Sequence, residues 1–428
     1  MPSPPNAPGS HLETRIRAVG QELASSLLAV LEELPGGPEA GPGPLAEVLG
    51  VDKVLTHRVL KAVRRDDPLA TAFHAPGPDP MRRFLRRAKS RGVESARVAR
   101  ADAAIRQFES LVRDELGNRS ALASVLASFL PEARREFEVR RKQSAFRAMS
   151  ELLGSEAEVA LSSVFLHPAA DPDSIDIVWL MGSLGLRRLR PGATVKFATK
   201  RHGRDEVDSS LPDPLVGEPG SPATDYRLER FCGASPAPLE IQRSGDALHY
   251  VLGESGYGPG SLVDLVLAEV NRAEIPRTVP VGSGRRGWFY ASTTIPSKLM
   301  LFDVLVHRDI YPESDPELLL YSSLENGIAD VNDITRDIDR LDLIETVEDL
   351  GTGLDRIDTK ASPRQGEVTR YIMEKLGWNP DEFRVWRACV EYPVLGVQVV
   401  MAFDPPEAGL DPEADEESDD RRVRRVWQ

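Results

Sequence analysis

Apolar residues at helical spacing dominate the first third of the chain. From His11 to Leu34 they recur at steps of three and four, which predicts a long amphipathic helix. A loop rich in Gly and Pro, residues 35–44, ends this helix. The same spacing returns through most of residues 95–153, where we expect further helices. Residues 1–10 contain Pro and Ser and are expected to be disordered.

The stretch Pro44–Leu60, reading PLAEVLGVDKVLTHRVL, predicts two short helices joined by a turn. Gly50 can adopt the positive φ with which the first helix must end, and Asp52 is a good N-cap for the second. We therefore expect a helix-turn-helix whose second helix runs to about Arg65. The polar side chains of that second helix are available to solvent or to a groove: Lys53, His57, Arg58 and Lys61.

These residues also resemble a known family. LAEVLGVDKVLTHRVL, residues 45–60 of a 428-residue chain, resembles the helix-turn-helix of bacterial transcription regulators. GVDKVLTHRVL is most similar to IclR-type repressors, whose recognition helix commonly reads G-hydrophobic-x-K-x-x-x-H-R-hydrophobic-Leu. The resemblance implies that Lys53, His57 and Arg58 lie on a recognition helix. Such a helix contacts base edges in the major groove of duplex DNA.

Three positions depart from the family pattern. Thr56 stands where the family buries an aliphatic residue, and Val54 and Leu55 stand where it shows small polar groups to DNA. Two apolar side chains on a reading helix can contact thymine methyl groups, or they can bury against another part of the protein. A helix-turn-helix can also be a protein-binding or purely architectural unit, so both interpretations stay open.

Charge is distributed unevenly along the chain. The formal net charge is −14 at pH 7, yet residues 53–100 hold 13 Lys and Arg against 4 Asp and Glu. A winged domain would show two strands here, but the prolines of residues 66–80 leave room for at most one. MRRFLRRAK instead predicts a basic helix, which either clamps phosphates or pairs with acidic residues. Its arginines are Arg82, Arg83, Arg86 and Arg87.

From residue 154 the pattern changes to short strand-like runs such as DIVWLM and LMLFDVLVH, with SLVDLVLAEV and GEVTRYIMEKLG as helices between them. An acidic stretch, residues 329–360, predicts an amphipathic helix. This strand and helix order does not match the compact ligand domain of IclR-type proteins, so the resemblance stops at the N-terminal unit.

The fold class that follows is a multidomain α+β protein. We expect an all-α, winged-helix-like DNA-binding domain at 11–92 and a helical linker or dimerisation region at 93–153. A mixed α+β domain at 154–405 would bind a small-molecule or protein effector, and 406–428 form a disordered charged tail. Because one helix-turn-helix contacts only a half-site, a homodimer on double-stranded DNA is expected.

No catalytic residue, metal site or cofactor is predicted. Cys232 and Cys389 are the only cysteines, which excludes a disulfide framework and a cysteine zinc site, and the seven His show no i, i+4 pair. A glycine-rich loop before an expected helix could hold a phosphate or other small anion, although glycine-rich hairpins are more common. The residues of this candidate anion loop are Gly256, Gly258, Gly260 and Ser261.

The expected function is a DNA-binding transcriptional regulator. The alternatives are a protein-interaction module whose helix-turn-helix only packs, and an enzyme whose C-terminal site the sequence does not reveal. We expect a cytoplasmic location, since there is no signal-peptide pattern and no run of about 18 apolar residues that would span a bilayer.

Overall fold

The structure, a computed structural model, comprises two compact units. We call Met1–Glu138 the helical unit and Val139–Gln428 the sheet unit. The division lies within one helix, whereas the sequence led us to expect boundaries at residues 92 and 153. The structure describes residues 8–201, 212–216, 226–233, 239–244, 247–253, 256–258 and 260–408.

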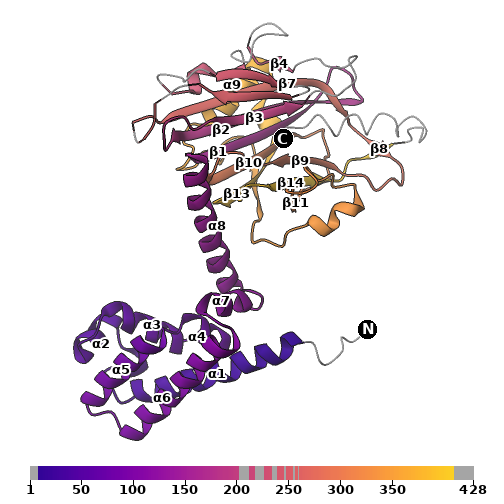
Figure 1. The fold of residues 1–428 in the computed structure, drawn as a ribbon. Coiled ribbons are helices and arrows are strands. Elements are labelled where there is room, and N and C mark those ends of the chain that lie inside the picture. The colour runs from indigo at the N-terminus through magenta and orange to yellow at the C-terminus, as the bar shows by residue number, and fades with distance from the viewer. Residues whose placement is uncertain are drawn as a thin grey trace. The chain divides into compact units, whose positions relative to one another are not determined.

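The helical unit contains no strand within its described residues, 8–138, so the single wing strand that the sequence allowed is not formed (Figure 1). Residues 8–10, expected to be disordered, begin the first helix, and residues 1–7 lie outside the described part of the chain. The helices are α1 (Pro8–Leu31), α2 (Pro42–Leu49), α3 (Lys53–Val63), α4 (Pro68–His74), α5 (Pro78–Ser90), α6 (Ser95–Ser110), α7 (Arg119–Ala127) and α8 (Pro131–Leu153), with a 3-10 helix η1 (Gly37–Glu39) and a π-helical turn η2 (Leu111–Glu115).

Helix α1 supplies the core against which the helical unit assembles. Its apolar stripe, including Ile16, Leu23 and Leu27, is fully buried, and α1 packs on α3, α4 and α6. At Gly20 the start of α4 approaches so closely that a Cβ atom there would lie 2.1 Å from the carbonyl oxygen of Pro68. The missing side chain is therefore required for this packing.

Helices α2 and α3 are joined by the three residues Gly50 to Asp52, as the sequence predicts. Gly50 ends α2 in the left-handed conformation, with φ 61°, and the Asp52 carboxylate accepts a hydrogen bond from the N–H of Val54. Thr56 is completely buried, and its hydroxyl donates to the carbonyl of Pro42 over 2.7 Å. This bond satisfies the hydroxyl and ties α3 to the start of α2.

The sheet unit is built on a seven-stranded sheet of order β12-β13-β10-β1-β2-β7-β4. All its pairs are antiparallel except β1 with β10. The strands are β1 (Ser155–Pro168), β2 (Ser174–Arg188), β4 (Asp213–Pro214), β7 (Val263–Pro276), β10 (Ser297–His307), β12 (Val347–Thr352) and β13 (Phe383–Glu391).

Two smaller sheets cover one face of this sheet. The first, of order β11-β14-β9, comprises β9 (Gly287–Ala291), β11 (Glu317–Ser322) and β14 (Val397–Phe403). The second, of order β3-β6-β5, comprises β3 (Val195–Arg201), β5 (Leu239–Ser244) and β6 (Ala247–Leu252). Both pack on side chains that alternate to the same face, such as Trp179 under the first and Met181 under the second.

Helix α9 (Gln365–Leu376), which the sequence predicts, covers the opposite face. A buried polar group fixes it there. Asp303, with no exposed surface, accepts hydrogen bonds at 2.6 and 2.7 Å from Arg387 and a further one from Gln365 of α9. Burial raises the pKa of Asp303, and the contacts with Arg387 and Gln365 oppose this shift.

Several predicted elements of the sheet unit are wrong. SLVDLVLAEV is not a helix but most of β7, and the acidic stretch contains only a 3-10 helix, η6 (Ile334–Asp339), and β12. Residues 409–428 of the expected tail lie outside the described part of the chain. The remaining short elements are β8 (Val279–Pro280), β15 (Glu407–Ala408), η5 (Glu229–Phe231) and η7 (Pro380–Glu382).

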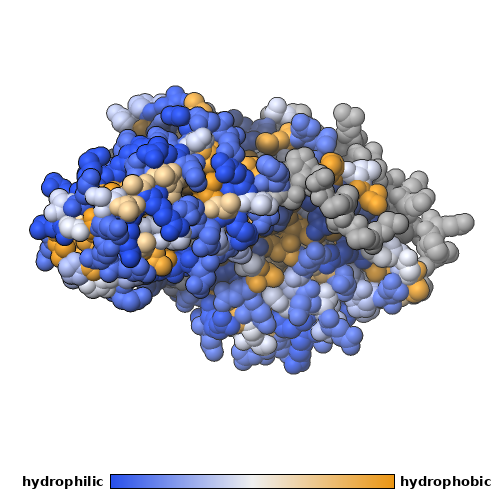
Figure 2. Space-filling view, turned by 90° about the horizontal axis from the view of Figure 1, so that it is seen from below, coloured by the Kyte–Doolittle hydropathy of each residue, from blue (hydrophilic) through white to orange (hydrophobic). Residues whose placement is uncertain are grey.

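Surface character gives no sign of a membrane span. Among the described residues, no helix combines the length and the apolarity that crossing a bilayer requires. On the face drawn in Figure 2, hydrophilic residues predominate and hydrophobic ones are scattered among them. Scattered apolar residues of this kind are ordinary on protein surfaces.

A pair of glycine substitutions tests the packing of α1. Gly20→Ala should destabilise the helical unit by about 1–3 kcal/mol, because the new methyl group forces α4 away from α1. Gly43→Ala, in the first turn of α2, is the control: a Cβ there meets nothing within 4 Å, so stability should stay equal or rise by up to about 1 kcal/mol.

Circular dichroism at 222 nm during urea unfolding measures the helical unit. The five tryptophans all lie beyond residue 178, so their fluorescence follows the sheet unit separately. Equal effects of the two substitutions would show that the close approach of α4 to Gly20 is unimportant for stability.

Candidate nucleic-acid interface

The outer face of α3 carries cationic and polar side chains without acidic partners. Lys53, His57 and Arg58 are exposed, and none of them forms an ion pair with a carboxylate among the described residues. The opposite face, which includes Val59 and Leu60, is buried in the core of the helical unit. Helix α3 therefore presents an outward face on which Lys53, His57 and Arg58 are exposed.

The structure separates the two apolar residues at the start of α3. Leu55 is 5% exposed and packs inward, whereas Val54 is 66% exposed. Of the two interpretations that the sequence left open, burial thus applies to Leu55. Val54 is an apolar side chain on the outer face beside Lys53, where a thymine methyl group could contact it.

Lys61 lies at the edge of this face in a cluster around Glu132 of α8. The Glu132 carboxylate lies 3.5 Å from Lys61, 3.4 Å from Arg65 and 3.3 Å from the Nε2 atom of His74. Burial, followed by the charge of Lys61, lowers the pKa of His74, so this histidine is neutral near pH 7. One carboxylate thus offsets part of the positive charge at the end of α3.

Arg119, at the start of α7, is a cation that the sequence analysis did not single out. Its guanidinium is largely buried, donates to the carbonyls of Phe73 and Ala75, and lies 5.3 Å from the centre of the Phe108 ring. Burial, followed by the charge of Arg58, lowers the pKa of Arg119 to about 10. Arg119 therefore stays charged near pH 7 and adds positive potential beside Arg58 without a carboxylate to neutralise it.

The basic helix α5 divides its four predicted arginines into two groups. Met81, Phe84 and neighbouring apolar residues bury one face against the core. On the flank toward α6, Arg82 pairs with Glu109 and lies 3.7 Å from Asp102. The others are exposed, without an ion pair to a described carboxylate: Arg83, Arg86 and Arg87.

This contrast extends across the helical unit. Most arginines elsewhere on its surface face carboxylates, so their charge is already compensated within the fold. Those arginines are Arg15, Arg17, Arg97, Arg100, Arg106, Arg113 and Arg134. Cations without such a partner are concentrated on α3 and on α5 with the turn that follows it, where Lys89 and Arg91 are also exposed. Arg135 of α8 is a further one.

The candidate anion loop of the sheet unit lacks the geometry that suggested it. The chain continues from it into β7, so no helix N-terminus points at the loop. The N–H groups of Gly258 and Ser261 donate to the carbonyls of Arg188 and Gly258, and the Ser261 hydroxyl also donates to Gly258. Gly260 and Gly256 are exposed beside these internal bonds.

Metal chemistry gains no support from the described residues, which contain no group of three or more His, Cys, Asp or Glu placed to hold a metal ion. Comparison with known proteins adds no family assignment: no protein-family model matches the sequence, and no curated protein matches it significantly.

Proposed function

We propose that the helical unit binds double-stranded DNA, with α2 and α3 acting as a helix-turn-helix and α3 as its reading helix. The observation that carries this proposal is the outer face of α3. Lys53, His57 and Arg58 are exposed there without carboxylate partners, whereas most surface arginines of the unit are paired. A cation that has no carboxylate partner within the fold contributes more binding free energy when it contacts a phosphate or a base edge, because no existing ion pair has to be broken.

Helix α5 supplies the sequence-independent part of the interface. Arg83, Arg86 and Arg87 lie on its exposed face, and α5 contacts both α2 and α3. Long arginine side chains in this position reach the phosphates that flank a groove. Arg82 is left out of the proposed contacts because Glu109 and Asp102 hold it, and Lys61 contributes less because Glu132 is close to it.

The protein as a whole would then be a transcriptional regulator. In this proposal the sheet unit senses an effector or binds a partner, and a homodimer places two α3 helices on two half-sites of the DNA. The apolar stripe of α1 is buried in the core of the helical unit and is not available to a second copy of the chain. We therefore propose the α6–α8 segment as the dimer interface. Phe129, between α7 and α8, is 38% exposed there.

The first prediction concerns salt. Binding of the full chain to duplex DNA should weaken steeply with salt, and four phosphate contacts, by Arg58, Arg83, Arg86 and Arg87, give a slope of log K against log salt of about −3 to −4. Replacing Arg86 and Arg87 by Ala should make the slope shallower by about 2. Fluorescence anisotropy with labelled duplex measures this.

The matched control removes the same number of charges from paired arginines. Arg100, which pairs with Glu22, and Arg106, which pairs with Asp102, are both exposed; replacing them by Ala should leave the slope nearly unchanged. A folded protein without affinity for DNA at about 50 mM salt would contradict DNA binding and favour the protein-interaction alternative.

The second prediction separates reading from positioning. After a selection from random duplexes has identified a preferred sequence, Lys53→Ala should relax the preference at one or two base pairs by about 1–3 kcal/mol. Arg86→Ala should weaken preferred and random sequences alike, since a phosphate contact carries no sequence information. If both variants lose affinity equally on the two kinds of DNA, α3 does not read bases through Lys53.

The third prediction concerns assembly. Sedimentation at micromolar concentration should show a dimer, and Phe129→Glu should raise the monomer fraction by placing a charge in the proposed interface. A protein that stays monomeric at this concentration, both alone and on DNA, rules out the paired half-site arrangement.

A further inference from the structure

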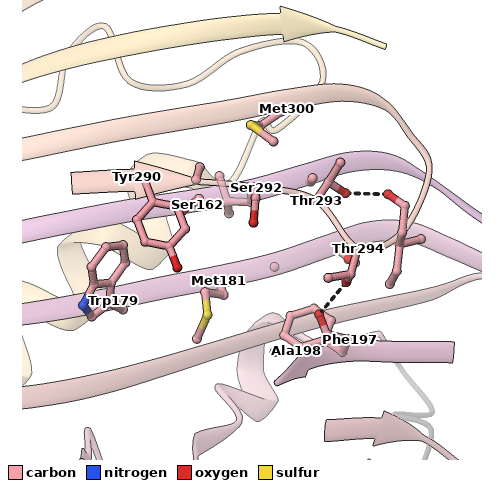
Figure 3. Close-up of a pocket in the computed structure, with 16 residues that line it drawn as sticks. Ser162, Trp179, Met181, Phe197, Ala198, Tyr290, Ser292, Thr293, Thr294 and Met300 are labelled. Atoms are coloured by element: carbon pink, nitrogen blue, oxygen red, sulfur yellow. Dashed lines mark hydrogen bonds between the residues drawn. The ribbon is translucent and has the colours of Figure 1, made fainter. Parts of the chain in front are cut away.

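A pocket lies on the face of the seven-stranded sheet that the two small sheets cover (Figure 3). Its floor comes from β1, β2 and β10. Ala160 pairs with Ser183 and Met300, and Ser162 pairs with Met181, so these side chains share one face of the sheet. The pocket has a volume of about 90 Å³.

The walls come from the edges of the two small sheets. Strand β9 and the residues after it, Tyr290 to Ile295, form one wall, and Phe197 and Ala198 of β3 form another. The Thr294 hydroxyl donates to the carbonyl of Phe197 over 3.1 Å, and this bond joins the two walls (Figure 3). A gap therefore remains between two edge strands that pack on one floor without pairing with each other.

The lining combines apolar bodies with hydroxyl groups. Trp179, Phe197, Met181 and Met300 supply aromatic rings and thioethers, which suit a flat aromatic molecule. None of the described lining residues is Asp, Glu, Lys, Arg or His, so a charged ligand would lose its hydration without a counter-charge.

Four lining hydroxyls have no hydrogen bond to any described residue: Ser162, Ser183, Tyr290 and Ser292. Ser183 is only 5% exposed, so an unpaired hydroxyl there lowers the stability of the fold unless water or a ligand forms a hydrogen bond with it. Ser162 and Ser292 are half-buried, so the pocket can be reached from solvent.

We propose that this pocket binds a small uncharged aromatic molecule that carries one or two hydrogen-bonding groups, such as a hydroxyl or an amide. At about 90 Å³ the pocket is smaller than the roughly 150 Å³ apolar cavity that accommodates benzene, but one side of it is open, so a single ring can enter with part of its surface left toward solvent. This pocket would be the effector site of the sheet unit, and that role, unlike the binding itself, rests on the proposed function.

The experiment measures ligand binding by the full chain without DNA, so a failure of DNA binding does not affect it. Benzyl alcohol is the neutral probe, and benzoate and benzylamine are charged probes of the same size. Saturation-transfer NMR and tryptophan fluorescence should show binding of benzyl alcohol at millimolar concentration, with at least about ten-fold weaker binding of both charged probes. Trp179→Phe should remove the fluorescence change while the NMR signal persists.

Two variants locate the site. Ser292→Phe places a ring in the pocket and should weaken the affinity for benzyl alcohol at least about ten-fold. Ser323, a half-buried serine of the same unit, lies outside the pocket, so Ser323→Phe should leave this affinity unchanged. Ser162→Ala, which keeps the fold, should weaken binding by about two- to five-fold through the lost hydroxyl. Equal binding by Ser292→Phe and Ser323→Phe, equal binding of all three probes, or no binding of benzyl alcohol would each overturn the proposal.

Discussion

The arrangement of the helical unit depends on the close contact between α1 and the start of α4. With Gly20 facing the Pro68 carbonyl, the backbones approach to a distance that no other residue type allows. Helix α4, which packs on α1, follows α3 in the chain at the point where a winged domain would have its strands. Helix α3 is therefore held by α1, α2 and α4, and its outer face is left exposed.

Local signals made the α2–α3 pair predictable. The left-handed conformation of Gly50 and the Asp52 cap depend on residues within one turn of each other, so the sequence contains all the information they need. The fate of individual cations depends on tertiary packing. Glu109 is 27 residues from Arg82, and Glu132 is 67 residues from Arg65, so the sequence alone could not show that these arginines are paired.

The sheet unit was predictable in class but less so in detail. Strand β7 was mistaken for a helix because both of its faces are buried. Leu265 and Leu267 pack under the small sheet, while Val266 and Ala268 face the side of α9, and a run buried on both faces loses the alternation that marks a strand. Likewise β13 and β14 are consecutive but belong to different sheets, a division that only long-range pairing determines.

Net charge is a poor guide to the partners of this protein, because most of its charge is compensated locally. The chain carries −14 overall, yet α3 and α5 expose cations that no described carboxylate neutralises, and the buried Arg119 beside Arg58 adds to their field. A carboxylate more than a Debye length away, about 8 Å at physiological salt, scarcely opposes a phosphate in direct contact with these arginines. If the helical unit binds DNA as proposed, the acidic surface elsewhere chiefly slows encounter with DNA at low salt, and the local excess of cations on α3 and α5 governs the affinity once contact is made.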